Sequence, residues 1–376
     1  MSSVKNSPST SAAKPAVDLG EDNGPLLARI FKLQSVWILC VLIAICLIFS
    51  LAAGSKFFAW SNIATITQNV SIWAVLGVGM TFVIITSGID LSIGSVLVFS
   101  SVVSAKVMEA MGGEGVGVAL AGVVAAVLSG VAWGIINGVL IAKSKIPPLI
   151  VTLGTLSIAL GLAQIITGGL DIRAVPDSLT DTIGYGRFLG IPMLTIIALI
   201  VLVIGGVVLH KTRFGRYTYA VGSNEEAARR VGVKVSRHLI KVYGMTGMLA
   251  GFAGLLSLAQ YSTTTIAGQS LTNLNVIAAV VIGGTSIFGG EGSIFGTVVG
   301  LFIPAVLLSG FTILGVTPYW QTVAVGTVLI AAVYVDQSRR AAASRGAKSS
   351  RRRSKPAAPA PAGPPATTPA PTAAKA

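Results

Sequence analysis

Few residues of this chain have the types and spacing that catalysis or metal binding needs. Its two cysteines, Cys40 and Cys46, stand six residues apart in one apolar segment, where packing is a better role for a thiol than a disulfide or a metal site. The two histidines, His210 and His238, border a basic loop and are interpreted as interfacial or solvated. The stretch 205–212 lacks the second glycine of a phosphate-binding loop, so any ATP is hydrolysed by another protein. The sequence therefore predicts no catalytic, cofactor-binding or metal site in this chain.

A polar, basic island at residues 213–234 interrupts the apolar sequence. Within it, Ser223 is expected to cap a short helix, with Glu226 closing a capping box and Gly232 ending the helix. One structured helix between membrane segments indicates a subunit that is driven by a separate motor. The alternative is a loop that serves only as a basic anchor for topology. The predicted docking residues are Asn224, Glu225, Glu226, Ala227, Ala228, Arg229, Arg230 and Gly232.

Two glycine-bearing turns join apolar segments with almost no loop. In the first, Asp90 lies at or near the membrane boundary, where a carboxylate is costly unless it is capped or solvated. Its expected role is to cap the helix beginning at Leu91, and a gating or interface role is the alternative. The second turn runs in the same sense, which would fit a parallel internal repeat. The turn residues are Gly88, Asp90 and Ser92 in the first, and Gly283, Gly284, Gly289 and Gly290 in the second.

Uncharged polar residues within the apolar segments are the candidates for a translocation path. Their weak, transient hydrogen bonds would suit a polyhydroxylated solute. For any single residue, hydrogen bonding between helices is the favoured alternative. The candidates are Gln68, Asn69, Asn137, Thr152, Thr155, Gln164, Asn273, Asn275 and Thr285.

Composition assigns the chain to the membrane. Charged residues make up 11% of it, against about a quarter in soluble domains, and 53% of its residues are hydrophobic. Ionisable side chains are nearly missing from the middle of the apolar segments, where proton- or sodium-coupled carriers usually place them. Aromatic residues do not interleave with the basic clusters, which argues against nucleic-acid binding.

The apolar pattern predicts an all-α integral membrane protein, a polytopic bundle of about ten transmembrane helices. Each segment is near the roughly 20 residues that cross the hydrocarbon core. The 273–288 segment is short and glycine-bearing, so a partial or broken span is expected there. Glycines at four-residue spacing in 130–138, 247–251 and 292–300 predict close helix crossings. The segments are 36–53, 67–86, 91–110, 116–142, 147–168, 190–209, 239–260, 273–288, 294–312 and 318–335.

Positive charge gathers in the loops of one predicted side. It fills the 210–241 loop, the link holding Lys143 and Lys145, and the tail from Asp336, so the positive-inside rule places both termini in the cytoplasm. Arginines in the tail attract anionic membrane lipid or serve orientation and solubility, the second role being favoured. The expected domains are a disordered tail at 1–35, a membrane domain at 36–335 with a cytoplasmic loop at 210–238, and a basic, then Ala/Pro-rich disordered tail at 336–376.

Four stretches in order resemble the permease subunits of ABC importers for ribose and other simple sugars. The resemblance covers about residues 60–335, and the long Ala/Pro/Arg tail departs from it. It implies a multi-pass protein of a bacterial inner membrane, similar in helix number to the vitamin B12-type importers. The stretches are Gly79-Met80-Thr81 through Ser92-Ile93-Gly94, Asn137-Gly138 with Ile150 to Thr155, Phe214-Gly215-Arg216 through Gly232-Val233, and Ala278 to Ser286 with Gly289-Gly290.

The same resemblance implies the partners. They are a second permease copy, a cytosolic ATP-binding subunit that carries ATP and magnesium, and an extracytoplasmic sugar-binding protein. The segment 224–232 would be the helix that docks in a groove of the ATPase. No motif identifies the sugar. The sequence also does not distinguish sugar import from import of another polar solute or from export. The alternative from another class is a stand-alone secondary carrier or facilitator for a small polar solute.

Overall fold

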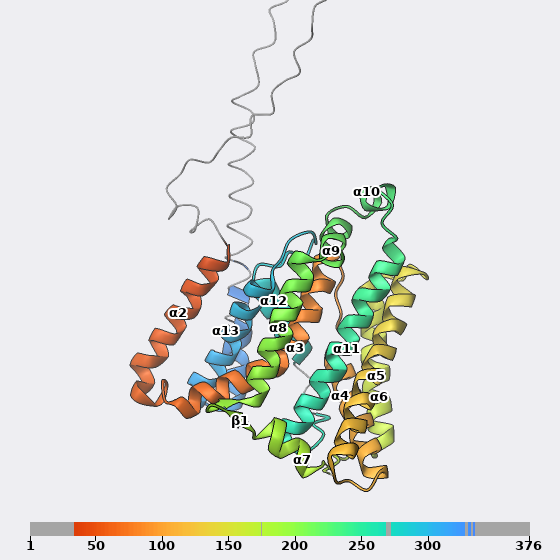
Figure 1. Ribbon diagram of the computed structural model, residues 1–376. Coiled ribbons are helices and arrows are strands. Elements are labelled where there is room, and N and C mark those ends of the chain that lie inside the picture. The colour runs from red at the N-terminus through yellow and green to blue at the C-terminus, as the bar shows by residue number, and fades with distance from the viewer. Residues whose placement is uncertain (1–33, 174, 268–271, 328–329, 332–333, 335–376) are drawn as a thin grey trace, which may run out of the picture. The chain divides into compact units, whose positions relative to one another are not determined.

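The computed structural model describes residues 34–173, 175–267, 272–327, 330, 331 and 334, and within these the chain is almost entirely helical (Figure 1). Eight described helices are long and apolar enough to cross a membrane, which confirms the predicted polytopic bundle. They are α2 (Gln34–Ala53), α3 (Trp60–Ile85), α4 (Ile93–Ala110), α5 (Val116–Ala142), α6 (Pro148–Thr167), α8 (Met193–Lys211), α11 (Val235–Tyr261) and α13 (Ile294–Ile313).

The ninth predicted segment is a short helix, α12 (Thr272–Ile282), followed by irregular backbone up to α13. The expected partial span is thus what forms. The tenth begins as a helix at Pro318, and the described residues from Tyr319 onward belong to a second unit. The expected tails at 1–35 and 336–376 lie outside the described residues, apart from the start of α2.

Shorter elements complete the described chain. Polar connections on one side contain α9 (Arg213–Ser223) and α10 (Glu225–Arg230). The link from α6 to α8 contains α7 (Asp177–Leu179), a π turn η2 (Thr180–Gly184) and the strands β1 (Arg187–Phe188) and β2 (Ile191–Pro192). The two strands pair antiparallel, with Phe188 opposite Ile191. A short 3-10 turn, η1 (Gly54–Lys56), follows α2.

The core of the first unit is built around α3 and α11. Their apolar residues extend all round each helix, as in Phe82 and Leu255, which are fully buried. α11 packs along α5 and also contacts α3 and α4, while α13 packs on α3, α12 and α2. Four helices are much less buried: less than a third of the apolar stretch is buried in each of α2, α5, α6 and α8, as expected of helices that face lipid.

The predicted glycine crossings are confirmed. A Cβ on Gly130 would overlap the carbonyl oxygen of Gly247, and one on Gly134 would overlap that of Tyr243, so α5 and α11 pack backbone to backbone. The same device joins α12 to α13, where Gly283 and Gly296 approach each other's backbone. These crossings fix α11 against the bundle, and α11 follows directly on the polar island.

One end of the bundle collects four connections. They are the links α3–α4, α5–α6, α8–α11 and α12–α13, and α9 and α10 stand at the top of this end in Figure 1. The link with Lys145 lies beside α10, because Lys145 and Arg229 line the same cavity. The opposite end carries α7 and β1, with charges of both signs. The bundle thus places the basic loops at one end, as the charge pattern predicts.

Candidate functional site

The polar island folds as two consecutive helices, α9 and α10. The predicted cap at Ser223 is wrong, because Ser223 is the last residue of α9. The cap is Asn224, whose side-chain oxygen accepts a hydrogen bond from the Ala227 N–H at 2.9 Å. Glu226 closes no capping box; its carboxylate pairs with Arg230 instead. Asn224 therefore has the structural role that the sequence analysis gave to Ser223.

Gly232 ends α10 as predicted. Its φ of 90° is in the left-handed region, and the N–H of Val233 donates to the Ala228 carbonyl at 3.0 Å. The Gly232 N–H donates to the Arg229 carbonyl at 3.0 Å, which completes a Schellman motif. A residue with a Cβ would be strained at this position. The chain therefore reverses sharply into α11.

α10 has one buried and one exposed face. Ala228 is buried in a small cluster with Val221 and Val235, which holds the helix on α9 and α11. The other face presents two ion pairs with i,i+4 spacing, Glu225–Arg229 and Glu226–Arg230. Exposed pairs of this kind contribute only about 0.3–0.5 kcal/mol each, so they orient side chains more than they hold the fold. Val231 is 80% exposed beside them.

The C-terminal end of α9 lies between the two glycine-bearing turns. The Ser87 hydroxyl donates to the Phe288 carbonyl at 2.8 Å and to the Gly222 carbonyl at 3.3 Å. The Gly290 N–H donates to the Ile85 carbonyl at 2.9 Å. We call this three-way contact of residues 85–88, 222–223 and 288–292 the clamp. Gly222 and Phe288 lie 135 and 201 positions after Ser87 in the sequence, so no local sequence pattern predicts the clamp.

Close backbone contact and one further bond tighten the clamp. A Cβ on Gly222 would overlap the Ile85 carbonyl oxygen, so only glycine fits there. The Tyr219 hydroxyl donates to the Gly292 carbonyl at 2.7 Å, and burial raises the pKa of this phenol. The C-terminal part of α9 therefore contacts the α3–α4 and α12–α13 connections together.

The first turn continues into a buried polar network. The Asp90 carboxylate oxygen accepts from the N–H and the hydroxyl of Ser92, at 2.9 and 2.6 Å. Asn137 donates to the Ser92 hydroxyl at 2.9 Å, and Asn273 donates to the Leu91 carbonyl at 2.9 Å. Burial raises the pKa of the Asp90 carboxyl, and the two hydrogen bonds from Ser92 lower it by less. This network links α4, α5 and α12 through one turn.

The predicted start of α4 needs correction. The helix begins at Ile93, with Ser92 in the cap position, and not at Leu91. Asp90 braces the turn ahead of the helix instead of capping a helix at Leu91, because its oxygen bonds Ser92 itself. The gating or interface role, which is the alternative for Asp90, remains a prediction.

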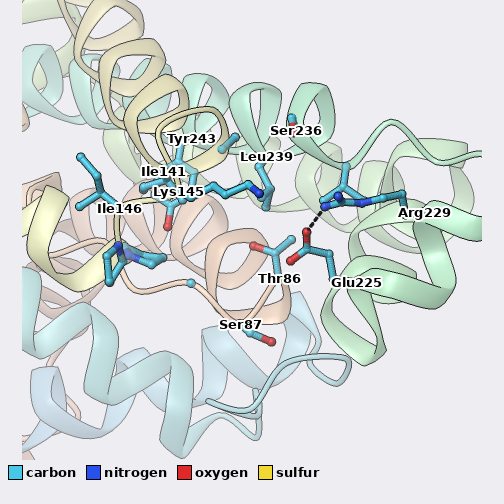
Figure 2. A pocket seen from close by; sticks show the side chains of 15 residues that line it. Thr86, Ser87, Ile141, Lys145, Ile146, Glu225, Arg229, Ser236, Leu239 and Tyr243 are labelled. Atoms are coloured by element: carbon cyan, nitrogen blue, oxygen red, sulfur yellow. Dashed lines mark hydrogen bonds and ion pairs between the residues drawn. The ribbon is translucent and has the colours of Figure 1, made fainter.

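A cavity of about 500 Å³ opens between α10 and the α5–α6 link. Figure 2 shows the Glu225–Arg229 ion pair at one side, with the Lys145 side chain extending toward it. The hydroxyl of Tyr243, which also lines the cavity, is buried and has no hydrogen-bond partner among the described residues. The cavity lies between the Glu225–Arg229 side of α10 and the α5–α6 link, while Ala228 on the other face of α10 packs on α9 and α11.

The candidate path residues do not gather into one lining. Asn137, Thr152, Thr155, Asn273 and Thr285 are buried, and Thr152 donates to the Ile89 carbonyl at 3.3 Å. Of the nine, Asn273 alone lines one of the four described cavities, a space of about 160 Å³ between α4, α6 and α12. Three of the nine, Asn137, Thr152 and Asn273, hydrogen-bond to residues 89–92. Outside this group, Asn69 accepts from Gln260 at 3.2 Å, Gln68 and Asn275 are half-buried, and Gln164 is exposed. Their role as a path remains a prediction.

Sequence reasoning missed several residues of the clamp. Ser87 and Tyr219 were not singled out, and Gly222 was seen only as part of the basic island. The glycine and serine content of 86–88 and 289–290 was the one available signal, and it predicted turns without predicting that they meet. Val231 was missed because a single apolar residue in a polar loop carries little information.

Comparisons with known proteins assign the chain to a family. Residues 62–333 match the family described as "Branched-chain amino acid transport system / permease component". The ribose import permease of Escherichia coli (strain K12) is 38% identical, with 83% of this chain and 95% of that protein covered. The ribose import permease of Bacillus subtilis (strain 168) is 40% identical, covering 74% and 86%, and the fructose import permease of Rhizobium meliloti is 36% identical, covering 80% and 84%. No solved structure gives a significant match. With its eight described membrane-length helices and this match over most of its length, the chain belongs to the family of multi-pass membrane permease components of such transport systems.

Proposed function

We propose that this protein is the membrane subunit of an ATP-driven importer for a monosaccharide. The clamp is the observation that carries the proposal, because it joins an exposed helix, α10, to two turns between membrane-spanning helices. Relatives named as ribose and fructose import permeases support the solute class. ATP and magnesium would be held by a separate cytosolic subunit.

In the proposed mechanism, the ATP-binding subunit receives α10 in a groove. Glu226, Arg230 and Val231 form the exposed surface that it would contact. Closure of that subunit on ATP pushes α10, and α9 passes the displacement to the clamp. The α3–α4 and α12–α13 connections then shift together, and the bundle alternates between outward and inward openings. The close contact of Gly222 with the Ile85 carbonyl would transmit this displacement, because no flexible side chain lies between the two backbones.

The proposal places solute choice mainly in an extracytoplasmic binding protein. Relatives for ribose and fructose are similarly close to this chain, at 38% and 36% identity, which agrees with a permease that discriminates little. Ionisable residues are nearly missing from the middle of the apolar segments, so the permease offers few charged groups for recognising a solute. The family's description mentions branched-chain amino acids, but the ribose and fructose import permeases that resemble this chain favour a sugar.

The assembly that we propose contains two copies of this permease, with the path between them. The nine path candidates do not line one common cavity among the described residues, which agrees with this arrangement, because a lining shared by two copies need not form within one. The basic connections at the α10 end would face the cytoplasm. The ATP-binding subunit would therefore reach α10 from that side.

The decisive variant is Glu226→Arg. It places a third positive charge beside Arg229 and Arg230 and removes the carboxylate of an exposed pair, so the fold should be unaffected. We expect the ATP-binding subunit to be lost on gentle detergent purification and sugar-stimulated ATP hydrolysis to fall at least ~10-fold, as about 1.4 kcal/mol of docking energy implies. Glu114→Arg makes the same charge change at the opposite end and should leave both intact.

Two outcomes would contradict the proposal. Unchanged sugar-stimulated hydrolysis in Glu226→Arg would remove α10 as the docking helix. A protein that purifies alone and still moves sugar in ATP-depleted vesicles would be a stand-alone carrier.

A further inference from the structure

The geometry points to a binding site for one anionic phospholipid, with α8 and α9 on one side and α11 on the other. Two cavities make up the site. A basic one at the membrane boundary is lined by α9 and α11, and an apolar one further along α11 is lined by α8 as well. This inference does not rest on ATP-driven transport, because it concerns the side of the bundle and not the face of α10.

The first cavity, which we call the basic cup, has a volume of about 440 Å³. Three cations line it: Lys234, Arg237 and Lys241. No acidic residue lines the cup, and within the described part of the chain none of the three forms an ion pair. Lys and Arg bind phosphate through charge-assisted hydrogen bonds, and basic pockets at the ends of membrane helices suit anionic headgroups.

The floor of the basic cup is aromatic and rigid. His238 packs against Phe214 with ring centroids 4.8 Å apart and lies 6.3 Å from the ring of Tyr217. A hydrogen bond of 3.0 Å between the His238 ring and the Thr218 hydroxyl holds the imidazole in place. Aromatic rings at this depth are typical of the membrane–water boundary, where headgroups lie. The cup is therefore a formed surface rather than a gap between mobile lysines.

The second cavity, which we call the apolar groove, has a volume of about 310 Å³. Its lining is almost wholly aliphatic and aromatic, including Ile204 and Val208 of α8 and Met248 and Phe252 of α11. Ile204 is 57% exposed, so the groove opens to the outside of the bundle. An acyl chain is the apolar partner that the membrane supplies in this place.

The helical register places the groove in line with the cup. Arg237, Lys241, Met245, Met248 and Phe252 follow one another at steps of four, four, three and four, so they share one stripe of α11. From Arg237 to Met248, α11 rises roughly 16 Å. A leaflet, from its headgroups to the bilayer centre, measures about 20 Å. Headgroup and chain of one lipid can therefore occupy both cavities.

The test compares lipids on the full-length protein in mild detergent by native mass spectrometry. Phosphatidylglycerol is titrated against phosphatidylcholine with the same chains, and glycerol phosphate serves as the headgroup without chains. The triple variant Lys234→Gln, Arg237→Gln, Lys241→Gln should weaken phosphatidylglycerol binding about 100-fold, since each cation near an anionic lipid contributes a factor of about five. Its control removes three exposed cations at the opposite end of the bundle (Lys56→Gln, Arg173→Gln, Arg187→Gln). This control has the same net charge as the triple variant and should change phosphatidylglycerol binding less than two-fold.

A second pair of variants tests the acyl chain. Ile204→Trp fills the groove and should weaken phosphatidylglycerol binding about ten-fold, whereas Leu199→Trp, equally exposed on the same helix but outside the groove, should have no effect. Gel filtration and thermal unfolding check that each variant folds. If the triple variant fails to fold, the Trp pair and the salt dependence of the unmodified protein decide the question.

Three results would overturn the proposal. Equal binding of both lipids to the unmodified protein would show that the cup does not select charge. Competition by glycerol phosphate as strong as by the intact lipid, with no effect of Ile204→Trp, would make the cup a site for a soluble anion. Loss of the ATP-binding subunit in the triple variant, with lipid binding unchanged, would make the cup part of a protein interface.

Discussion

At the scale of single residues, the clamp depends on the absence of a side chain at Gly222. We predict that Gly222→Ala lowers the free energy of unfolding by about 1–3 kcal/mol, because the new Cβ overlaps the Ile85 carbonyl and forces the turn away. Solute uptake should fall further than stability, since the displaced turn no longer follows α9. Thermal unfolding in detergent and uptake into proteoliposomes measure the two effects.

Gly206→Ala is the matched control for this variant. Gly206 is also a helical glycine, but nothing lies within 4 Å of a Cβ placed there. Alanine favours helix over glycine by up to about 1 kcal/mol, so this variant should be neutral or slightly more stable. Equal behaviour of the two alanine variants would contradict the clamp.

At the scale of elements, the α5–α11 crossing holds the helix that follows α10. We predict that Gly134→Leu prevents this crossing, because even a Cβ there meets the Tyr243 carbonyl and a leucine must push α5 and α11 apart. The loss should exceed ~3 kcal/mol and leave little monodisperse protein in gel filtration. Gly154→Leu on α6, where a Cβ meets nothing within 4 Å, should give a normal yield. A normal yield from both would mean that the glycines of α5 are dispensable.

At the scale of the whole molecule, the charge layout predicts which end faces the cytoplasm. In a protein without Cys40 and Cys46, Glu226→Cys and Asp177→Cys place single thiols at opposite ends of the bundle. We expect a membrane-impermeant thiol reagent to label Asp177→Cys on intact cells whose outer layers are permeabilised, and Glu226→Cys only after the inner membrane is opened. The reverse pattern would invert the proposed topology and remove α10 from reach of a cytosolic partner.

Local sequence was sufficient for the helices because hydropathy and length act over some 20 residues. It placed eight spans within a few residues, although α3 begins seven residues before its predicted start, at Trp60. Polar residues such as Ser61 and Asn62 interrupt the apolar pattern before residue 67, so the pattern does not predict the first turns of α3. Packing against neighbouring helices stabilises these turns. The cap of α10 was misplaced by one residue because α9 continues through Ser223, and Asn224 is the residue with the extended backbone conformation of a cap.

The sequence by itself determined that this is a multi-pass membrane protein, where its spans lie, which connections are basic, and that a short helix ends at Gly232. Each of these depends on composition or on interactions within a few residues along the chain. Only the tertiary structure decided that α9 joins the two turns, that three of the nine candidate path residues meet at residues 89–92, and that a basic cup lies in line with an apolar groove. Those features bring together backbone from segments far apart, such as Ser87 and Phe288, whose approach depends on how whole helices pack.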